Sequence, residues 1–181
     1  MKTRQILLDA AKNLLEKHKF DDITVQDIID EAGVARTTFY RYFDDKYDIV
    51  STYYKEYITM EMLCEYNGEN FDEICLKIYD FMEKNKKFFK NILKNNREDF
   101  FSDFLYKYVL DAYYQNYKNF VKITTITDEA KFKMAAMANL SVFWFKKWIE
   151  EDCSIPAETM IQWGKDIIID IYSICETEQK Q

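Results

Sequence analysis

TVQDIIDEAGVARTTFYRYFDDKYDIV, residues 24–50, has the make-up of two short helices joined by a tight turn. Thr24 is followed three residues later by Asp27, which resembles a capping box at the start of the first helix. Gly33 ends that helix, because glycine readily adopts the positive φ found just past a helix C-terminus. The second helix is predicted over residues 35–43. Two short helices in this arrangement are typical of a helix-turn-helix, whose second helix lies in the major groove of DNA.

The second of these helices carries Arg36 and Arg41, two of the four arginines in the chain. A guanidinium group donates two parallel hydrogen bonds to a guanine edge, so we expect Arg36, at the start of the helix, to read a base. Hydroxyl and ammonium groups nearby suit phosphate oxygens. Phe39 and Phe43 are expected in the core, and an amphipathic helix without a DNA role is the alternative interpretation. The residues predicted to bind DNA are Thr24, Gln26, Arg36, Thr37, Thr38, Tyr40, Arg41, Tyr42 and Lys46.

Residues 32–50, AGVARTTFYRYFDDKYDIV, carry the pattern GV…TFY.YF..K..I. With this pattern the chain resembles the TetR family of bacterial transcription regulators over about residues 3–50. The resemblance implies a helix-turn-helix DNA-binding domain over residues 1–46 and a helical regulatory and dimerisation domain over residues 47–181. It also implies that the residues matching Arg36, Thr37, Tyr40, Tyr42 and Lys46 meet the operator, and that those matching Thr24 and Gln26 often do.

The C-terminal part resembles, less specifically, the regulators of dihydroxyacetone kinase operons. The resemblance rests on FWFKKWIEEDCSIPAETM, residues 143–160. Some members of that group respond to a protein partner instead of a metabolite. The sequence EEDC, residues 150–153, replaces a glycine that is typical of the group, so no protein partner is carried over to this chain.

The composition favours an all-α protein. The 181 residues include only three glycines and one proline, and 48% of them are hydrophobic. Such a composition fits poorly with hairpin-rich, collagen-like or disordered chains. Apolar residues recur at helical spacing, and Asp44, Asp45 and Asp48 are interpreted as helix caps. Nine helices are predicted, at residues 3–18, 25–32, 35–43, 46–65, 71–85, 86–96, 98–120, 127–151 and 154–175.

Several classes of function are disfavoured by the sequence. One histidine, no G-x-S-x-G and no phosphate-binding loop argue against an enzyme, so no catalytic residues are assigned. The four cysteines lie far apart, and neither a metal nor another cofactor is expected. A net charge of −7 argues against coating of nucleic acid. The N-terminus resembles no signal peptide and no apolar run approaches the roughly 20 residues of a membrane span, which predicts a cytoplasmic protein without a membrane partner.

A homodimer is expected, because a single reading head covers too few base pairs for useful specificity. In residues 161–175, apolar and small residues step by three and four, as in a heptad seam. Residues 134–145, MAAMANLSVFWF, are apolar nearly all round and should contact a second surface as well as their own core. Burial of both segments in a monomer is the alternative. The residues predicted at the dimer interface are Val142, Phe145, Ile161, Gly164, Ile168, Ile171 and Cys175, and the operator of such a dimer would be a near-palindrome.

Aromatic residues crowd the segment between residues 71 and 114. They could line a pocket for a small apolar or aromatic effector, which predicts a repressor that this effector releases. The alternative is a filled core in an activator or adaptor that binds a protein partner. Its docking surface would be an exposed patch on the three helices predicted between residues 71 and 120, where residues 84–96, KNKKFFKNILKNN, make a basic stretch with paired phenylalanines. The residues predicted to bind the effector are Phe104, Tyr108, Tyr113, Trp144 and Trp148.

Overall fold

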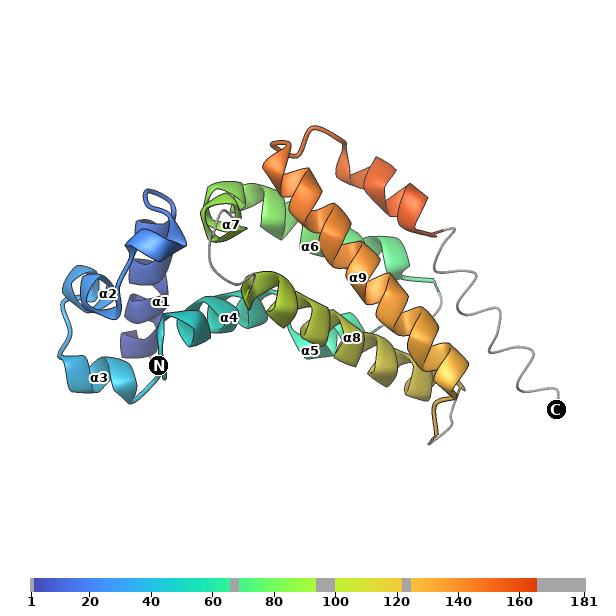
Figure 1. Cartoon of the computed structure of the whole chain (residues 1–181), viewed down its shortest axis with the longest axis horizontal. Helices are drawn as coiled ribbons and strands as arrows, with labels where there is room; N and C mark the ends of the chain where they lie inside the picture. The colour runs from blue at the N-terminus through green and yellow to red at the C-terminus, as the bar shows by residue number, and fades with distance from the viewer. Residues whose placement is uncertain (1, 66–68, 94–99, 122–124, 166–181) are drawn as a thin grey trace.

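The computed structural model describes residues 2–65, 69–93, 100–121 and 125–165, and within these ranges it contains helices and no strand (Figure 1). This confirms the predicted all-α class. A further helix covers residues 157–165. The other helices are α1 (Lys2–Leu15), the 3-10 helix η1 (Phe20–Asp22), α2 (Val25–Ala32), α3 (Arg36–Tyr40), α4 (Lys46–Tyr57), α5 (Met60–Cys64), α6 (Phe71–Lys84), α7 (Lys86–Leu93), α8 (Phe100–Val121) and α9 (Asp128–Glu150).

The first three α-helices form a compact head at one end of the molecule, drawn in blue in Figure 1. Leu7 and Leu8 of α1 are fully buried, and Phe39 and Phe43 pack in the same core. This burial confirms the predicted core positions of both phenylalanines. Because those two side chains point inward, the neighbouring polar residues of α3 are left on the outside of the head.

The ends of α2 follow the predicted capping chemistry. The hydroxyl oxygen of Thr24 accepts a hydrogen bond from the Asp27 backbone N–H, and the Thr24 backbone N–H donates to the Asp27 carboxylate at 2.7 Å. Gly33 closes the helix with φ at 63°. This left-handed conformation turns the chain sharply toward α3.

The prediction of one continuous helix over residues 46–65 is wrong. Helix α4 ends at Tyr57, and α5 begins at Met60. The hydroxyl of Thr59 caps α5 by accepting a hydrogen bond from the Met62 backbone N–H. Tyr108 donates its hydroxyl hydrogen to the Ile58 carbonyl at 2.8 Å, which satisfies an oxygen that the break releases. The described residues therefore contain ten α-helices instead of nine. The helix predicted over residues 35–43 is also shorter than expected and ends at Tyr40.

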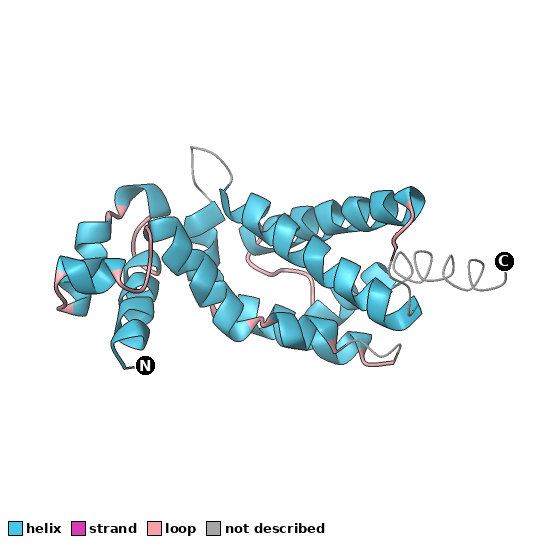
Figure 2. Cartoon of the chain, turned by 90° about the horizontal axis from the view of Figure 1, so that it is seen from below, coloured by secondary structure: helices cyan, strands magenta, loops and turns pink. Residues whose placement is uncertain are grey.

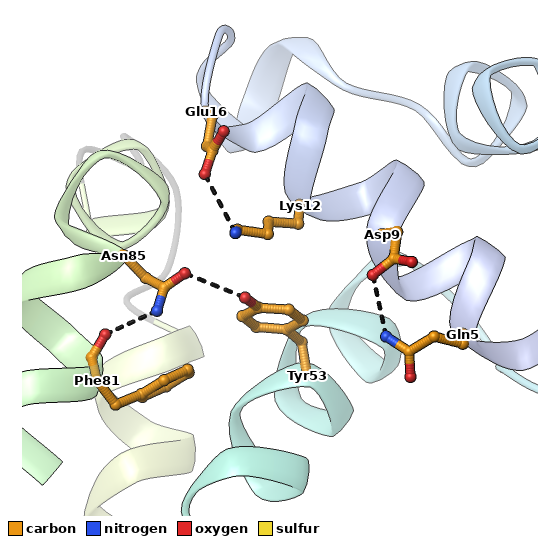
Figure 3. Close-up of polar contacts among 7 residues, drawn as sticks. All are labelled: Gln5, Asp9, Lys12, Glu16, Tyr53, Phe81 and Asn85. Atoms are coloured by element: carbon orange, nitrogen blue, oxygen red, sulfur yellow. Dashed lines mark hydrogen bonds and ion pairs between the residues drawn. The ribbon is translucent and has the colours of Figure 1, made fainter. Parts of the chain in front are cut away.

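Helices α8 and α9 lie side by side and form the body, with α6 and the helix at residues 157–165 against them (Figures 1 and 2). Helix α4 runs from the head into this body. Figure 3 shows one of its contacts there: Tyr53 donates to the Asn85 side-chain oxygen, and Asn85 donates to the Phe81 carbonyl. None of the helices in the described ranges has the length and apolar character needed to cross a membrane.

Candidate nucleic-acid interface and ligand cavity

Arg36 lies on the exposed face of the head, between α2 and α3. Its guanidinium group donates to the Gln26 side-chain oxygen and to the Tyr40 hydroxyl, each at 3.2 Å. Gln26 in turn donates to Asp30 at 2.8 Å. The guanidinium carbon also lies 5.3 Å from the centre of the Tyr40 ring. These exposed contacts join three of the predicted DNA-binding residues into one polar surface and hold Arg36 in a defined direction.

The other predicted residues of α3 and the turn after it surround Arg36. Thr37 is exposed and Thr38 is half-buried, and both lie in the first turn of α3. Arg41 is exposed and lies over the ring of the half-buried Tyr42, 4.9 Å from its centre. Helix α3 therefore presents two arginine–tyrosine pairs, and guanidinium and phenol groups are suitable donors to base edges and phosphates.

Thr24 stands at the N-terminus of α2, where its side chain is occupied by the cap. Its hydroxyl donates to the Asp27 carboxylate at 2.6 Å while accepting from the backbone of the same residue. These hydrogen bonds from Thr24 lower the pKa of Asp27 below its ordinary value. The hydroxyl hydrogen and the backbone N–H of Thr24 are thus both engaged within the protein.

Lys46 is held by the protein itself, which the sequence did not indicate. Its ammonium group donates to the Phe20 carbonyl at 2.9 Å and to the Ile23 carbonyl at 2.7 Å. It also lies 4.3 Å from the centre of the Phe20 ring. The side chain therefore ties the loop before α2 to the start of α4, a positioning role beside the phosphate contact that was predicted for it.

Among the acidic residues that follow α3, Asp45 is the N-cap of α4. The Asp45 carboxylate accepts hydrogen bonds from the backbone N–H groups of Tyr47 and Asp48, both at 2.8 Å. Asp48 accepts one from the Asp44 backbone N–H. This arrangement explains why carboxylates stand next to a surface built to meet DNA.

A cavity of about 370 Å³ lies in the body between α6, α8, α9 and the helix at residues 157–165. Its wall is mostly apolar and aromatic, and it contains a few hydroxyl, thiol and amide groups. Its lining residues include Cys75, Tyr79, Asn116, Met137, Ser141 and Trp163.

Two of the five predicted effector residues, Tyr113 and Trp144, line this cavity. The other three are not among its lining residues. Phe104 and Tyr108 stack on each other at 5.6 Å, and the Tyr108 hydroxyl is bound to Ile58. Trp148 is buried away from the cavity, where its indole N–H donates to the Ile155 carbonyl at 2.7 Å. Aromatic residues fill this core as well as lining the cavity, so residue type alone did not separate the two groups.

Three of the predicted dimer residues are buried within one protomer. The exposed fractions of Val142, Phe145 and Ile161 are 8%, 6% and 5%. All three also line the cavity. This burial leaves little of their side chains for contact with a second chain, and their place at a dimer interface stays a prediction. Gly164 is half-buried at the same cavity, and Ile168, Ile171 and Cys175 lie outside the described residues.

The sequence analysis missed the polar residues of the cavity. Cys75 is close enough to Tyr79 and Tyr113 to contribute to the shifts of their pKa values, and burial raises the pKa of the Cys75 thiol to about 12. Tyr113 shares a hydrogen bond of 3.2 Å with Ser141 across α8 and α9. The sequence signal that could have indicated these cavity residues is a single polar residue within an otherwise apolar helix. Only the packing of the helices brings such residues together in one wall.

Comparison with known proteins agrees with this architecture. Residues 7–52 match the model of the bacterial regulatory proteins of the TetR family, and residues 69–170 match a transcriptional regulator C-terminal region of the same group. The chain belongs to the TetR family. It is a transcriptional regulator with a DNA-binding helix-turn-helix head.

Two relatives match parts of this TetR-family regulator. A helix-turn-helix regulator of Haemophilus influenzae is 47% identical over 45 residues, which cover 24% of this chain and 22% of that protein. The dhaKLM operon transcriptional activator DhaS of Lactococcus lactis is 25% identical over 101 residues, 55% of this chain and 54% of that one. The match therefore spans only about a fifth and about half of these two relatives. A solved structure of a dihydroxyacetone kinase operon activator DhaS shares the fold, with a TM-score of 0.63, 18% identity and 97% coverage of both chains.

Proposed function

We propose that this regulator is a homodimeric repressor of a near-palindromic operator, released by a small apolar or aromatic effector. Residues 1–46 would bind DNA, and residues 47–181 would bind the effector and the second protomer in the bacterial cytoplasm. The proposal of an effector rests on the cavity of about 370 Å³, because its volume falls in the range of small-molecule binding sites.

In this proposal α3 lies in the major groove, with Arg36 donating to a guanine edge and Thr37, Thr38 and Tyr40 beside it. Arg41, Tyr42 and the start of α4 at Lys46 face phosphates, while Thr24 and Gln26 meet the same DNA from α2. The contact of Arg36 with Gln26 and Tyr40 supports this assignment, because it directs the guanidinium group before DNA arrives.

The dimer would form through the outer face of α9 and the helix that includes residues 157–165. The exposed fractions of Phe132 and Phe143 on α9 are 75% and 59%, and Trp163 is also exposed. Aromatic side chains of this kind are enriched at protein interfaces. Phe143→Glu should therefore give monomers in analytical ultracentrifugation. Leu76→Glu, an exposed apolar position on α6, is the control that should leave the dimer intact.

The test of the proposed function is selection of genomic DNA fragments by the purified protein at physiological salt. The recovered operator is then placed at a promoter, and transcription is measured with and without the protein. A near-palindromic site and a fall in transcription support the repressor. Failure to enrich any sequence contradicts it.

The second candidate is an activator or adaptor that binds a protein partner. It is favoured by the match to the Lactococcus lactis protein, which is named as an activator of its operon. Within the described part of the basic stretch, residues 84–93, the paired Phe88 and Phe89 are fully buried and offer no apolar surface to a partner. A rise in transcription in the promoter experiment would favour this candidate over the repressor.

A further inference from the structure

The wall of the body cavity has an uncharged but selective chemistry. No aspartate, glutamate, lysine, arginine or histidine stands among the lining residues of the described chain. A charged ligand group would lose its hydration there without gaining a counter-charge. The cavity therefore suits an uncharged molecule, and its polar groups decide which one.

Asn116 of α8 supplies a polar group without a partner. Its side chain is 6% exposed, and its Nδ2 donates to the Leu63 carbonyl at 2.7 Å. That bond fixes which end of the amide is oxygen, because a carbonyl accepts only from the NH₂ end. The oxygen Oδ1 is buried and has no hydrogen-bond partner. An unsatisfied buried acceptor carries a free-energy cost that a ligand donor would relieve.

A pair of hydroxyl groups lies one helical turn away on the same side of α8. Tyr113 is three residues before Asn116, and residues three apart on a helix are neighbours. Tyr113 and Ser141 share one hydrogen bond, which uses the hydrogen of only one of the two hydroxyls. The other hydrogen remains for a ligand acceptor. The wall thus offers one acceptor at Asn116 and one donor at the Tyr113–Ser141 pair.

We infer that the effector is an uncharged, largely aromatic or apolar molecule bearing a hydroxyl group, which donates to Asn116 Oδ1 and accepts from the Tyr113–Ser141 pair. This inference rests on the proposed effector function and deepens it. Because Oδ1 is covered by protein atoms, the ligand must displace a neighbouring side chain. The flexible side chains of Met82 and Met137 in the wall can make such room.

The test uses four probes with one common skeleton: 4-phenylphenol, biphenyl, 4-methoxybiphenyl and biphenyl-4-carboxylate. Each is titrated into the 181-residue protein, and binding is followed by calorimetry and by the fluorescence of Trp144 and Trp163 at the cavity. One to two hydrogen bonds should make 4-phenylphenol bind about 3- to 10-fold more tightly than biphenyl or the methyl ether. The carboxylate should bind most weakly of the four.

Asn116→Leu should abolish the preference for 4-phenylphenol over biphenyl while biphenyl still binds, because the apolar wall is kept. Ser141→Ala gives a second variant that does not touch the Leu63 contact and should reduce the same preference. Asn119→Leu, the same change at an exposed position of α8, should leave it unchanged. Equal affinity for the phenol and the hydrocarbon in the unaltered protein, tightest binding of the carboxylate, or no binding of any probe overturns the inference.

Operator affinity is measured separately with each probe. Selective binding of 4-phenylphenol that leaves operator affinity unchanged supports the inference about ligand class and contradicts the proposed effector function. If the probes release the operator but 4-phenylphenol binds no more tightly than biphenyl, the result supports the proposed effector function and contradicts the inference about ligand class. The two proposals can therefore fail independently.

Discussion

Individual side chains of the head combine recognition with structural support. Arg36 is joined to Gln26 on another helix, whereas Arg41 contacts only its neighbour Tyr42 among the contacts described. The sequence predicted that both arginines would meet DNA, and it could not show this difference. A guanidinium held by contacts from two helices is better directed toward one base than a side chain at the end of α3.

Arg36→Ala is therefore expected to weaken operator binding by about 1–3 kcal/mol per half-site and to relax the preference at one base pair. Arg41→Ala is the matched variant, and it should weaken all sequences alike and reduce the salt dependence of binding. Binding to a library of operator variants at two salt concentrations measures both effects. A uniform loss of affinity in Arg36→Ala would show that this residue does not read a base.

Lys46 makes a separate contribution to stability. Lys46→Met removes two charge-assisted hydrogen bonds to the Phe20 and Ile23 carbonyls, and the free energy of unfolding should fall by about 1–3 kcal/mol. Urea unfolding measures the change. Lys17→Met, at an exposed position of the head, should alter stability by less than about 0.5 kcal/mol. Equal stabilities of the two variants would argue against the positioning role of Lys46.

At the scale of the elements, the ends of α2 decide how α3 is presented. Thr24 and Asp27 fix the first turn and Gly33 the last, and all three were identified from residue type and spacing. The break between α4 and α5 was not identified, because each side of it has a helical pattern. It depends on the hydroxyl of Tyr108, a residue 50 positions away from Ile58.

Gly33→Ala should destabilise the protein by about 1–2 kcal/mol, because alanine is strained at a φ of 63°. An added Cβ would meet no atom within 4 Å, so the effect is one of backbone conformation alone. Gly164→Ala has equally open space in a helix and should instead be neutral or stabilising by up to about 1 kcal/mol. Thermal and urea unfolding compare the two, and a stabilised Gly33→Ala protein would contradict the turn argument.

The capping box also predicts a pH dependence. The hydrogen bonds from Thr24 lower the pKa of Asp27 in the folded state, so its stabilising contribution is present above the ordinary value of 3.8 and is lost as the pH falls through the lower folded value. Asp27→Asn should remove this part of the acid dependence, whereas Asp22→Asn should retain it. Unfolding free energies between about pH 2 and pH 6 test the difference. Identical acid profiles for the two variants would exclude a contribution from Asp27.

On the scale of the whole molecule, the head and the body are joined by few polar contacts. Arg4 of α1 pairs with Glu56 of α4. Asn91 of α7 donates to the Leu15 carbonyl at 2.8 Å, at the C-terminus of α1, where helix carbonyls lack intrahelical partners. The head and the body also share one hydrophobic core, in which the Phe20 ring lies 4.6 Å from the Phe100 ring of α8. The routes between the cavity and α3 therefore include α4, the two polar contacts and this apolar core.

Removing both polar contacts in Arg4→Ala with Asn91→Ala should weaken the coupling between the head and the body, which the shared apolar core maintains in part. All three tryptophans lie in the body, so their fluorescence reports on the body alone, while far-ultraviolet circular dichroism reports on all helices. The two transitions should coincide in the unaltered protein and separate in the double variant, with the circular dichroism signal lost first. Lys118→Ala with Asn119→Ala on the surface of α8 is the control. Coincident transitions in both variants would contradict the coupling.

The sequence by itself determined the all-α class, the helix-turn-helix and the caps of α2 and α4. These features depend on contacts between residues close together in the chain, so spacing and residue type are sufficient to predict them. Only the tertiary structure decided which aromatic residues line the cavity, which apolar residues of α9 stay exposed, and that Asn116 lies beside the Tyr113–Ser141 pair. Those outcomes depend on how distant helices pack, because the same aromatic side chain fills a core or lines a cavity according to what lies opposite it.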